Sequence, residues 1–280
     1  MRAHQRIESL IAGDGDTADQ NNMLSTHPRT ADRIAQAIDL ADNNGAASDS
    51  GNTRRGVGRY LKQIDGMVFG DGVEQGLVRG TRFIHPDMRF EFEVPEGFTI
   101  HNKPDMVLAV DDKNNSIKFA EAAAKDVRAA GGMEKFLTRK WSDDATLKNV
   151  EWVDINGLKA VTGAASVWTG KRKVDVRRII IEQDRKHYWR FQFVTDKKDT
   201  ARLNEAFRRT TYSFHILSRS QAMAVQPWRV RVVTVGQGVT FDDLVGSMAV
   251  PEYQKEWFEA LNGIGPDDPL IPGSRVKVIK

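Results

Sequence analysis

Residues 150–168 read VEWVDINGLKAVTGAASVW. Two segments rich in β-branched and aromatic side chains, 150–155 and 158–168, flank the dipeptide Asn156-Gly157. Asn and Gly both tolerate the positive φ angles that a two-residue type I′ turn requires. The stretch therefore predicts a β-hairpin.

A second predicted hairpin follows directly. Its strands are residues 174–182 and 187–194, on either side of a turn at 184–186. Every other residue of the second strand, from His187 to Phe193, carries a ring, so these side chains share one face of a sheet. Residues 199–212 have apolar side chains at helical spacing and predict a closing helix.

The same two-residue period appears upstream of the first hairpin. Four apolar residues alternate with charged ones: Met88, Phe90, Phe92 and Val94. Further strands are predicted at 107–110 and 117–122, and a helix at 133–141. Residues 73–220 are therefore predicted to form an α+β domain, an antiparallel sheet with helices packed against it. Its element order resembles the PsbP/Mog1-like fold.

The C-terminal segment, residues 226–280, has the predicted order strand, helix, helix, strand. The strands are expected at 229–235 and 275–279. Thr240, followed three residues later by Asp243, predicts the start of the first helix, because this spacing is typical of a capping box.

The N-terminal segment, residues 1–72, is predicted to be a helical segment followed by a linker. Helices are expected at 2–11 and from Thr30 to residue 41, where Thr30 is a suitable N-cap. Residues 42–56 are rich in Asn, Ser and Gly and predict a flexible linker. An apolar patch within residues 60–69 is expected to dock onto another part of the protein.

Composition limits the function classes. The 280 residues include 41 basic and 38 acidic side chains, a net charge of +3, and no cysteine. Disulfides, thiolate metal sites and cysteine catalysis are therefore excluded. No apolar run approaches the roughly 20 residues of a membrane-spanning helix, and no secretory signal is visible. The basic runs at 171–173 and Arg177-Arg178 are interpreted as solvated, so no nucleic-acid partner is predicted.

The segment STHPRTADRI, residues 25–34, resembles the segment that follows the zinc site in bacterial gluzincin metallopeptidases of the BepA and HtpX type. Residues 60–98 are similar to the join between the peptidase and accessory domains of that group. In this resemblance His27 approaches the zinc ion. The supporting positions are Thr26, Pro28 and Arg33.

That family binds zinc through an H-E-x-x-H helix, which supplies two His ligands and a Glu base, and through a later Glu. No two of the six histidines here stand four residues apart, so the motif is missing. The resemblance implies the C-terminal portion of a zinc metallopeptidase of the periplasm or cell envelope, which acts in protein quality control. This chain alone would be inactive and would hold no zinc, and its protein substrates would need the missing catalytic domain.

The alternative is a standalone, non-enzymatic envelope protein, a binding or scaffold module. An independent enzyme with a different site is disfavoured, because no Ser-His-Asp pattern, Walker loop or dinucleotide-binding glycine motif stands out. The six tryptophans are predicted to be core and interface residues. They are Trp141, Trp152, Trp168, Trp189, Trp228 and Trp257.

Residues 229–280 resemble a diverged LysM module, chiefly through ALNGI at 260–264 and IPGSRVKVI at 271–279. LysM modules bind N-acetylglucosamine polymers, so the resemblance implies peptidoglycan as a partner. The implied glycan-binding residues are Gly238, Thr240, Asn262 and Gly263. The usual Gly-Asp-Thr-Leu turn is Gly-Val-Thr-Phe here, which departs from the LysM pattern.

Overall fold

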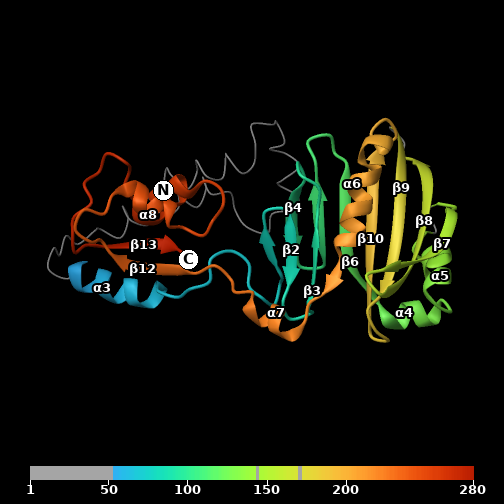
Figure 1. Cartoon of the computed structure of the whole chain (residues 1–280), viewed down its shortest axis with the longest axis horizontal. Coiled ribbons are helices and arrows are strands. Elements are labelled where there is room, and N and C mark those ends of the chain that lie inside the picture. The colour runs from blue at the N-terminus through green and yellow to red at the C-terminus, as the bar shows by residue number, and fades with distance from the viewer. Residues whose placement is uncertain (1–52, 143–144, 170–171) are drawn as a thin grey trace, which may run out of the picture. The chain divides into compact units, whose positions relative to one another are not determined.

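The computed structural model describes residues 53–142, 145–169 and 172–280. They form two compact units (Figure 1). Residues 53–70 and 228–280 belong to unit 1, and residues 71–227 to unit 2, so unit 2 is inserted into the chain of unit 1. The predicted helices of residues 2–41 lie outside the described residues, as do Thr26, His27, Pro28 and Arg33.

The main feature of unit 2 is a seven-stranded antiparallel sheet with the spatial order β4-β5-β6-β10-β9-β8-β7. The strand bounds are β4 Thr99–Lys103, β5 Met106–Val110, β6 Ser116–Ala123, β7 Lys148–Ile155, β8 Leu158–Trp168, β9 Lys173–Glu182 and β10 His187–Asp196. The predicted α+β class with a large antiparallel sheet is confirmed.

Strands β7 and β8 form the hairpin that residues 150–168 predict. Asn156 and Gly157 have φ angles of 52° and 86°, as a type I′ turn requires. The Asp154 side chain accepts a hydrogen bond from the Gly157 N–H at 2.8 Å. The turn therefore fixes the register, with Ile155 opposite Leu158.

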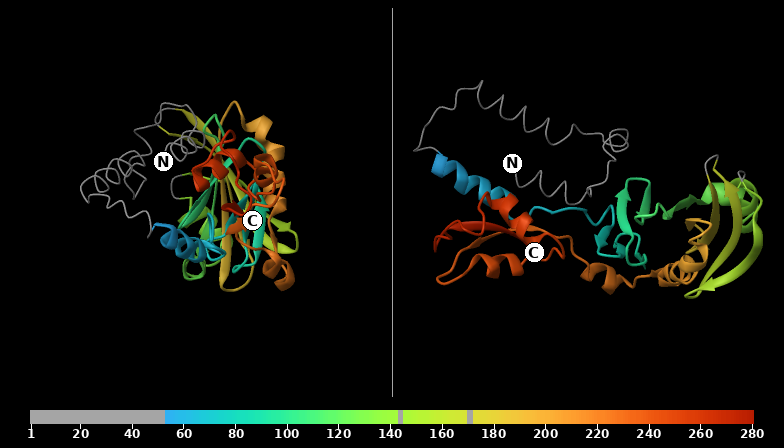
Figure 2. Two further views of the ribbon diagram at one scale, coloured as in Figure 1. Left: turned by 90° about the vertical axis from the view of Figure 1, so that its left-hand side faces the viewer. Right: turned by 90° about the horizontal axis from the view of Figure 1, so that it is seen from above.

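One face of the large sheet is partly covered by helix α6 (Thr200–Ser213) and by a second, four-stranded sheet of order β1-β2-β3-β11. The bounds of this smaller sheet are β1 Leu77–Arg79, β2 Arg82–His85, β3 Phe90–Glu93 and β11 His215–Ile216. The aromatic side chains between the layers pack into one core: Phe83, Phe90, Phe92, Phe98, Phe119, Trp189, Phe191, Phe193, Phe207 and Phe214. Seen from above, the strands of the large sheet bend around α6 (Figure 2).

The opposite face of the sheet carries α4 (Ala124–Ala129), α5 (Met133–Lys135) and a π-helical turn, Phe136–Lys140. The helix predicted at 133–141 is thus only partly α-helical. The Trp141 N–H bonds to the Phe136 carbonyl at 2.8 Å, which is the i→i+5 bond of a π-helix. A short helix, α7 (Arg219–Ala224), comes near the end of unit 2.

Unit 1 contains the predicted strand-helix-helix-strand order. Its elements are β12 Val230–Thr234, α8 Phe241–Gly246, α9 Gln254–Asn262 and β13 Arg275–Ile279, and the two strands pair antiparallel. Thr240 and Asp243 form the predicted capping box. Phe258 is fully buried at the centre of this core.

Helix α3 (Thr53–Ile64) and the segment after it differ from the sequence prediction in two ways. Residues 53–56, which were predicted to be part of the linker at 42–56, are helical, and residues 42–52 lie outside the described residues. The segment after α3 does not stand apart from the C-terminal module: Gly66 and Met67 exchange backbone hydrogen bonds with Val230. The segment therefore pairs through its backbone with the edge of β12. The expected docking of the apolar patch is met only in part, because Tyr60, Met67 and Val68 stay exposed while Phe69 packs against the core of unit 1.

No described helix is long and apolar enough to cross a membrane.

Candidate functional site

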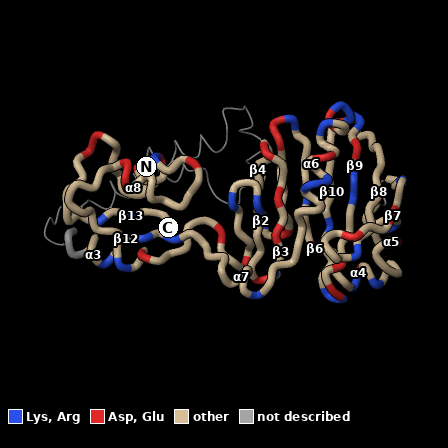
Figure 3. The backbone as a smooth tube through the Cα atoms, viewed as in Figure 1, with Lys and Arg blue, Asp and Glu red and all other residues tan. Residues whose placement is uncertain are grey.

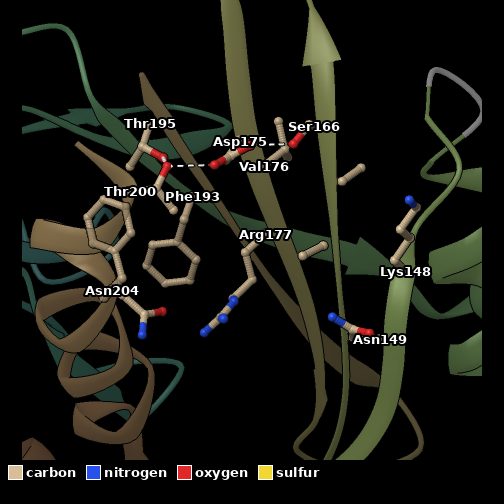
Figure 4. A pocket seen from close by; sticks show the side chains of 13 residues that line it. Lys148, Asn149, Ser166, Asp175, Val176, Arg177, Phe193, Thr195, Thr200 and Asn204 are labelled. Carbon is tan, nitrogen blue, oxygen red and sulfur yellow. Dashed lines mark hydrogen bonds between the residues drawn. The ribbon is translucent and has the colours of Figure 1, made fainter. Parts of the chain in front are cut away.

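A groove lies where α6 leaves the large sheet uncovered, between α6 and strands β7 to β9 (Figure 4). Its cavity volume is about 280 Å³, just below the usual range of small-molecule sites, which begins at about 300 Å³. Side chains of one sheet face form the floor, and the first half of α6 forms one wall.

One cross-strand row gives the floor its character. Four residues pair across neighbouring strands: Lys148 of β7, Ala164 of β8, Arg177 of β9 and Phe193 of β10. Opposite residues of antiparallel neighbours share a face, so all four border the groove. Because Ala164 is small, the row has a gap between two cationic side chains.

The next row holds the acidic side chain of the groove. Asp175 of β9 lies between Ser166 of β8 and Thr195 of β10, and it pairs with both. Ser166 donates to one Asp175 oxygen, and Thr200 of α6 donates to the other at 2.7 Å. Partial burial raises the pKa of Asp175, but these two hydrogen bonds, with Lys197 and Lys173, lower it overall. Asp175 is therefore a fixed, ionised side chain.

The side chains of Arg177 and Lys148 are available to contact a ligand. Neither side chain has a hydrogen bond or ion pair with another described residue. Both oxygens of Asp175 are already occupied by hydroxyl groups, although it lies two residues from Arg177 on the same face. Figure 4 shows the Arg177 side chain in the open space between Asn204 of α6 and Lys148 and Asn149 of β7. Figure 3 shows the basic positions along β9.

The apolar part of the groove lies toward α6. The rings of Phe193 and Phe207 stand 4.8 Å apart, and both side chains are buried. The groove therefore joins an apolar base to two exposed cations and several amide and hydroxyl groups. This combination is typical of sites that orient a small ligand.

The predicted glycan-binding residues serve the fold of unit 1. Thr240 accepts from the Asp243 N–H at 3.2 Å and donates to the Asp243 carboxylate at 2.7 Å. The Asn262 amide bonds the Lys277 backbone N–H at 2.7 Å and its carbonyl at 2.9 Å. Gly238 and Gly263 both have positive φ angles, 71° and 68°. The two polar side chains are thus already engaged within unit 1.

Sequence reasoning missed Lys148, Asp175 and Arg177. The interpretation of Arg177-Arg178 as solvated is right for Arg177 and wrong for Arg178, which is only 5% exposed. Arg178 points to the other sheet face and donates to the Trp141 carbonyl at 2.8 Å. The available signal was the alternation along β9, which places Asp175 and Arg177 on the same face as buried Ile179.

The tryptophan prediction is wrong for two positions. Trp189 lies in the core, but Trp152 and Trp168 are 56% and 67% exposed. Trp152 stands on an edge strand, where its Nε1 donates to Glu134 at 3.0 Å. Trp168 ends β8 on the same face as Ala164 and Ser166.

No family model and no curated protein matches this chain. Several solved structures are similar to part of it, among them the following three. A protein from Bacteroides thetaiotaomicron is 10% identical over 55% of this chain, with a TM-score of 0.38, and the match spans only 53% of that protein. Cyanobacterial PsbP from Synechocystis is 20% identical over 54% of this chain and 98% of its own, with a TM-score of 0.34. The Ran-binding protein Mog1 from Saccharomyces cerevisiae is 11% identical over 52% and 99%, with a TM-score of 0.36.

These findings overturn the resemblance to gluzincin metallopeptidases, which is wrong. The similar structures include a PsbP, a Mog1 protein and the mycobacterial protein LpqN, none of them described as a peptidase, and no family model matches. Within the described ranges, no group of three or more His, Asp or Glu side chains is placed to hold a metal ion.

Proposed function

We propose that this chain is a non-enzymatic binding protein and that its ligand occupies the groove between α6 and strands β7 to β9. The observation that carries the proposal is the row Lys148–Ala164–Arg177–Phe193. It places two unpaired cations and an apolar base around one small cavity. Both cations are exposed and have no partner among the described residues, so they are available to a ligand.

The lining favours binding over catalysis. Asp175 is the acidic side chain of the groove, and its pKa is lowered by the hydroxyl groups that bond both of its oxygens. A carboxylate held in this way is a weak base and does not deliver a proton near neutral pH. The remaining polar lining consists of amides, hydroxyls and the two cations, which suit recognition.

The test fills the groove with a bulky side chain. A library of small molecules is screened by the backbone amide shifts of Ala164, Arg177 and Asn204 in the labelled protein. Ala164→Trp is expected to abolish the binding of every hit without lowering the unfolding temperature of unit 2. Lys118→Trp adds the same indole on the opposite sheet face and is expected to leave binding unchanged. The proposal fails if no compound shifts these amides, or if Ala164→Trp binds as well as the wild type.

A second candidate site is the strand-helix-helix-strand module of unit 1, as a LysM-like glycan-binding module. The element order and the antiparallel β12–β13 pair favour it. The internal hydrogen bonds of Thr240 and Asn262 leave mainly backbone groups near Gly238 and Gly263 for a sugar. Sedimentation with insoluble peptidoglycan tests it, and recovery in the supernatant would rule it out. The envelope location stays a prediction.

A further inference from the structure

The chemistry of the groove points to one ligand class, and this inference rests on the proposed function. We infer that the ligand is a small amphiphilic anion. Its oxyanion, a carboxylate or a phosphate, lies over Ala164 between Lys148 and Arg177. Its apolar body lies against Phe193 and Phe207.

The spacing of the two cations fits an oxyanion between them. Lys148 and Arg177 are separated by the single strand β8, which places their backbones about 10 Å apart. Both side chains are long enough to converge over the methyl group of Ala164. Arg177 offers a planar fork of donors that matches a carboxylate or a phosphate, while Lys148 adds a mobile point charge.

Asp175 gives the ligand an orientation. Its carboxylate is fixed one row away from Arg177, on the side of Ser166 and Thr195. The negative charge of Asp175 repels the oxyanion of the ligand from that row and directs it toward Ala164 and β7. The amides of Asn149 and Asn204 border the same space and can donate to the remaining oxygen atoms.

The size of the cavity limits the ligand. A volume of about 280 Å³ admits a ligand of roughly ten non-hydrogen atoms and excludes a polymer from the apolar base. Phe193 is 1% exposed and Phe207 6%, so only the rims of these rings are open to the apolar group of a ligand. The anion supplies orientation, and Ala164 together with these rims supplies the apolar contact.

The experiment uses three probes of equal chain length on the full chain: octanoate, octyl phosphate and the neutral octanol. Calorimetric titration is expected to show one of the two anions binding at least 10-fold more tightly than octanol. Arg177→Gln and Lys148→Gln are each expected to weaken that anion about 10-fold, as the loss of one charge-assisted hydrogen bond predicts. Lys118→Gln removes a cation from the opposite face and is expected to change nothing. Arg177→Lys keeps the charge and is expected to recover part of the affinity.

The outcomes separate this inference from the proposed function. The tighter of the two anions identifies the oxyanion as a carboxylate or a phosphate. If octanol binds as tightly as both anions, or if Arg177→Gln leaves anion affinity unchanged in a folded protein, the anion assignment is wrong and the groove remains a binding site. If neither these probes nor any screened molecule shifts the groove amides, the proposed function falls with it.

Discussion

Asn115 is the most connected buried amide of unit 2. It is fully buried, its Nδ2 donates to Asp111 at 2.8 Å and to Asp199 at 3.3 Å, and its Oδ1 accepts from the Asp196 N–H at 3.0 Å. These bonds tie the β5–β6 turn to the start of α6, the wall of the groove. Asn115→Ala removes all three side-chain hydrogen bonds at once and leaves a gap in the buried network, and bonds to charged groups are each worth about 1.5–3 kcal/mol.

We expect Asn115→Ala to lower the free energy of unfolding by about 3 kcal/mol, measured by urea denaturation followed by circular dichroism. Asn204→Ala, the same substitution at an exposed position of α6, is the matched control and should change the free energy by about 0.5 kcal/mol or less. Equal effects of the two substitutions would contradict the role given to Asn115.

His85 makes stability depend on pH. Burial lowers the pKa of its imidazole, which Asp87 raises only in part, and its Nδ1 accepts from the Met88 N–H at 3.3 Å. Between the folded pKa and about pH 6.5, the ordinary pKa of histidine, the folded state therefore holds fewer protons than the unfolded state. Stability is present above that pH and is lost as the pH falls through the folded pKa.

Urea denaturation between pH 7.5 and pH 5 tests this expectation. The wild type should lose stability on acidification, and His85→Gln should lose less, because Gln does not titrate. A residual slope is expected from His101, whose pKa is also lowered by burial and by Lys103. Parallel pH profiles for the two proteins would count against His85.

The turn of the β7–β8 hairpin sets the strand register and also binds the end of α6. The Asn156 amide donates to the carbonyls of Tyr212 and Phe214 at 2.8 and 2.9 Å, so the turn also holds the end of α6. Asn156→Gly keeps the freedom to adopt a positive φ and loses only these bonds, about 1 kcal/mol each. Asn156→Ala loses the bonds and adds a left-handed strain of about 1 kcal/mol.

We expect Asn156→Ala to lower the free energy of unfolding of unit 2 by about 1 kcal/mol more than Asn156→Gly. Chemical denaturation of both variants measures the difference. If Asn156→Gly proves as stable as the wild type, the bonds to the end of α6 contribute nothing and the turn acts through its φ angle alone.

Short-range patterns predicted the elements of unit 2 well. The Asn-Gly turn, the alternation around Phe90 and the spacing in residues 199–212 each depend on a few adjacent residues. The smaller sheet escaped prediction, because β1 and β11 have three and two residues and are held by long-range pairing. The π turn at 136–140 was missed because its extra residue per turn leaves no clear period.

The groove escaped prediction for a physical reason. Its key row takes Lys148, Ala164, Arg177 and Phe193 from four strands, and only the register brings them together. From the sequence alone, a cationic residue on a strand is interpreted as solvent-exposed, because the residues opposite it on the neighbouring strands are unknown. The α+β class and the order of elements in unit 1 followed from the sequence, whereas the site follows from the sheet.

At the level of the whole chain, α3 and the segment after it complete unit 1. Phe69 packs edge-on against Trp257 with ring centroids 4.9 Å apart, and its N–H bonds the Trp228 carbonyl at 2.7 Å. We therefore expect a fragment of residues 226–280 to be poorly folded by itself, because the edge of β12 and this aromatic pocket are bare. Addition of a peptide of residues 53–70 should restore dispersed amide signals in its NMR spectrum.

A matched peptide with Phe69→Ala should restore them much less, since it lacks the ring. A fragment 226–280 that gives a dispersed spectrum and a cooperative melting curve without any peptide would show that the C-terminal module needs no help from α3.

The backbone pairing of residues 66–69 with residues 228–230 has a mechanical consequence. The insertion of unit 2 starts and ends at neighbouring positions, since Val68 and Arg229 form a β-bridge. Tension applied between residue 53 and residue 280 therefore crosses this short pairing and bypasses the 157 residues inserted at 71–227. In a pulling experiment this pairing and the Arg229–Lys280 pairing carry the load before any strand of unit 2 does. Until these pairings rupture, unit 2 and its groove bear no tension, so a ligand can stay bound while unit 1 is under load.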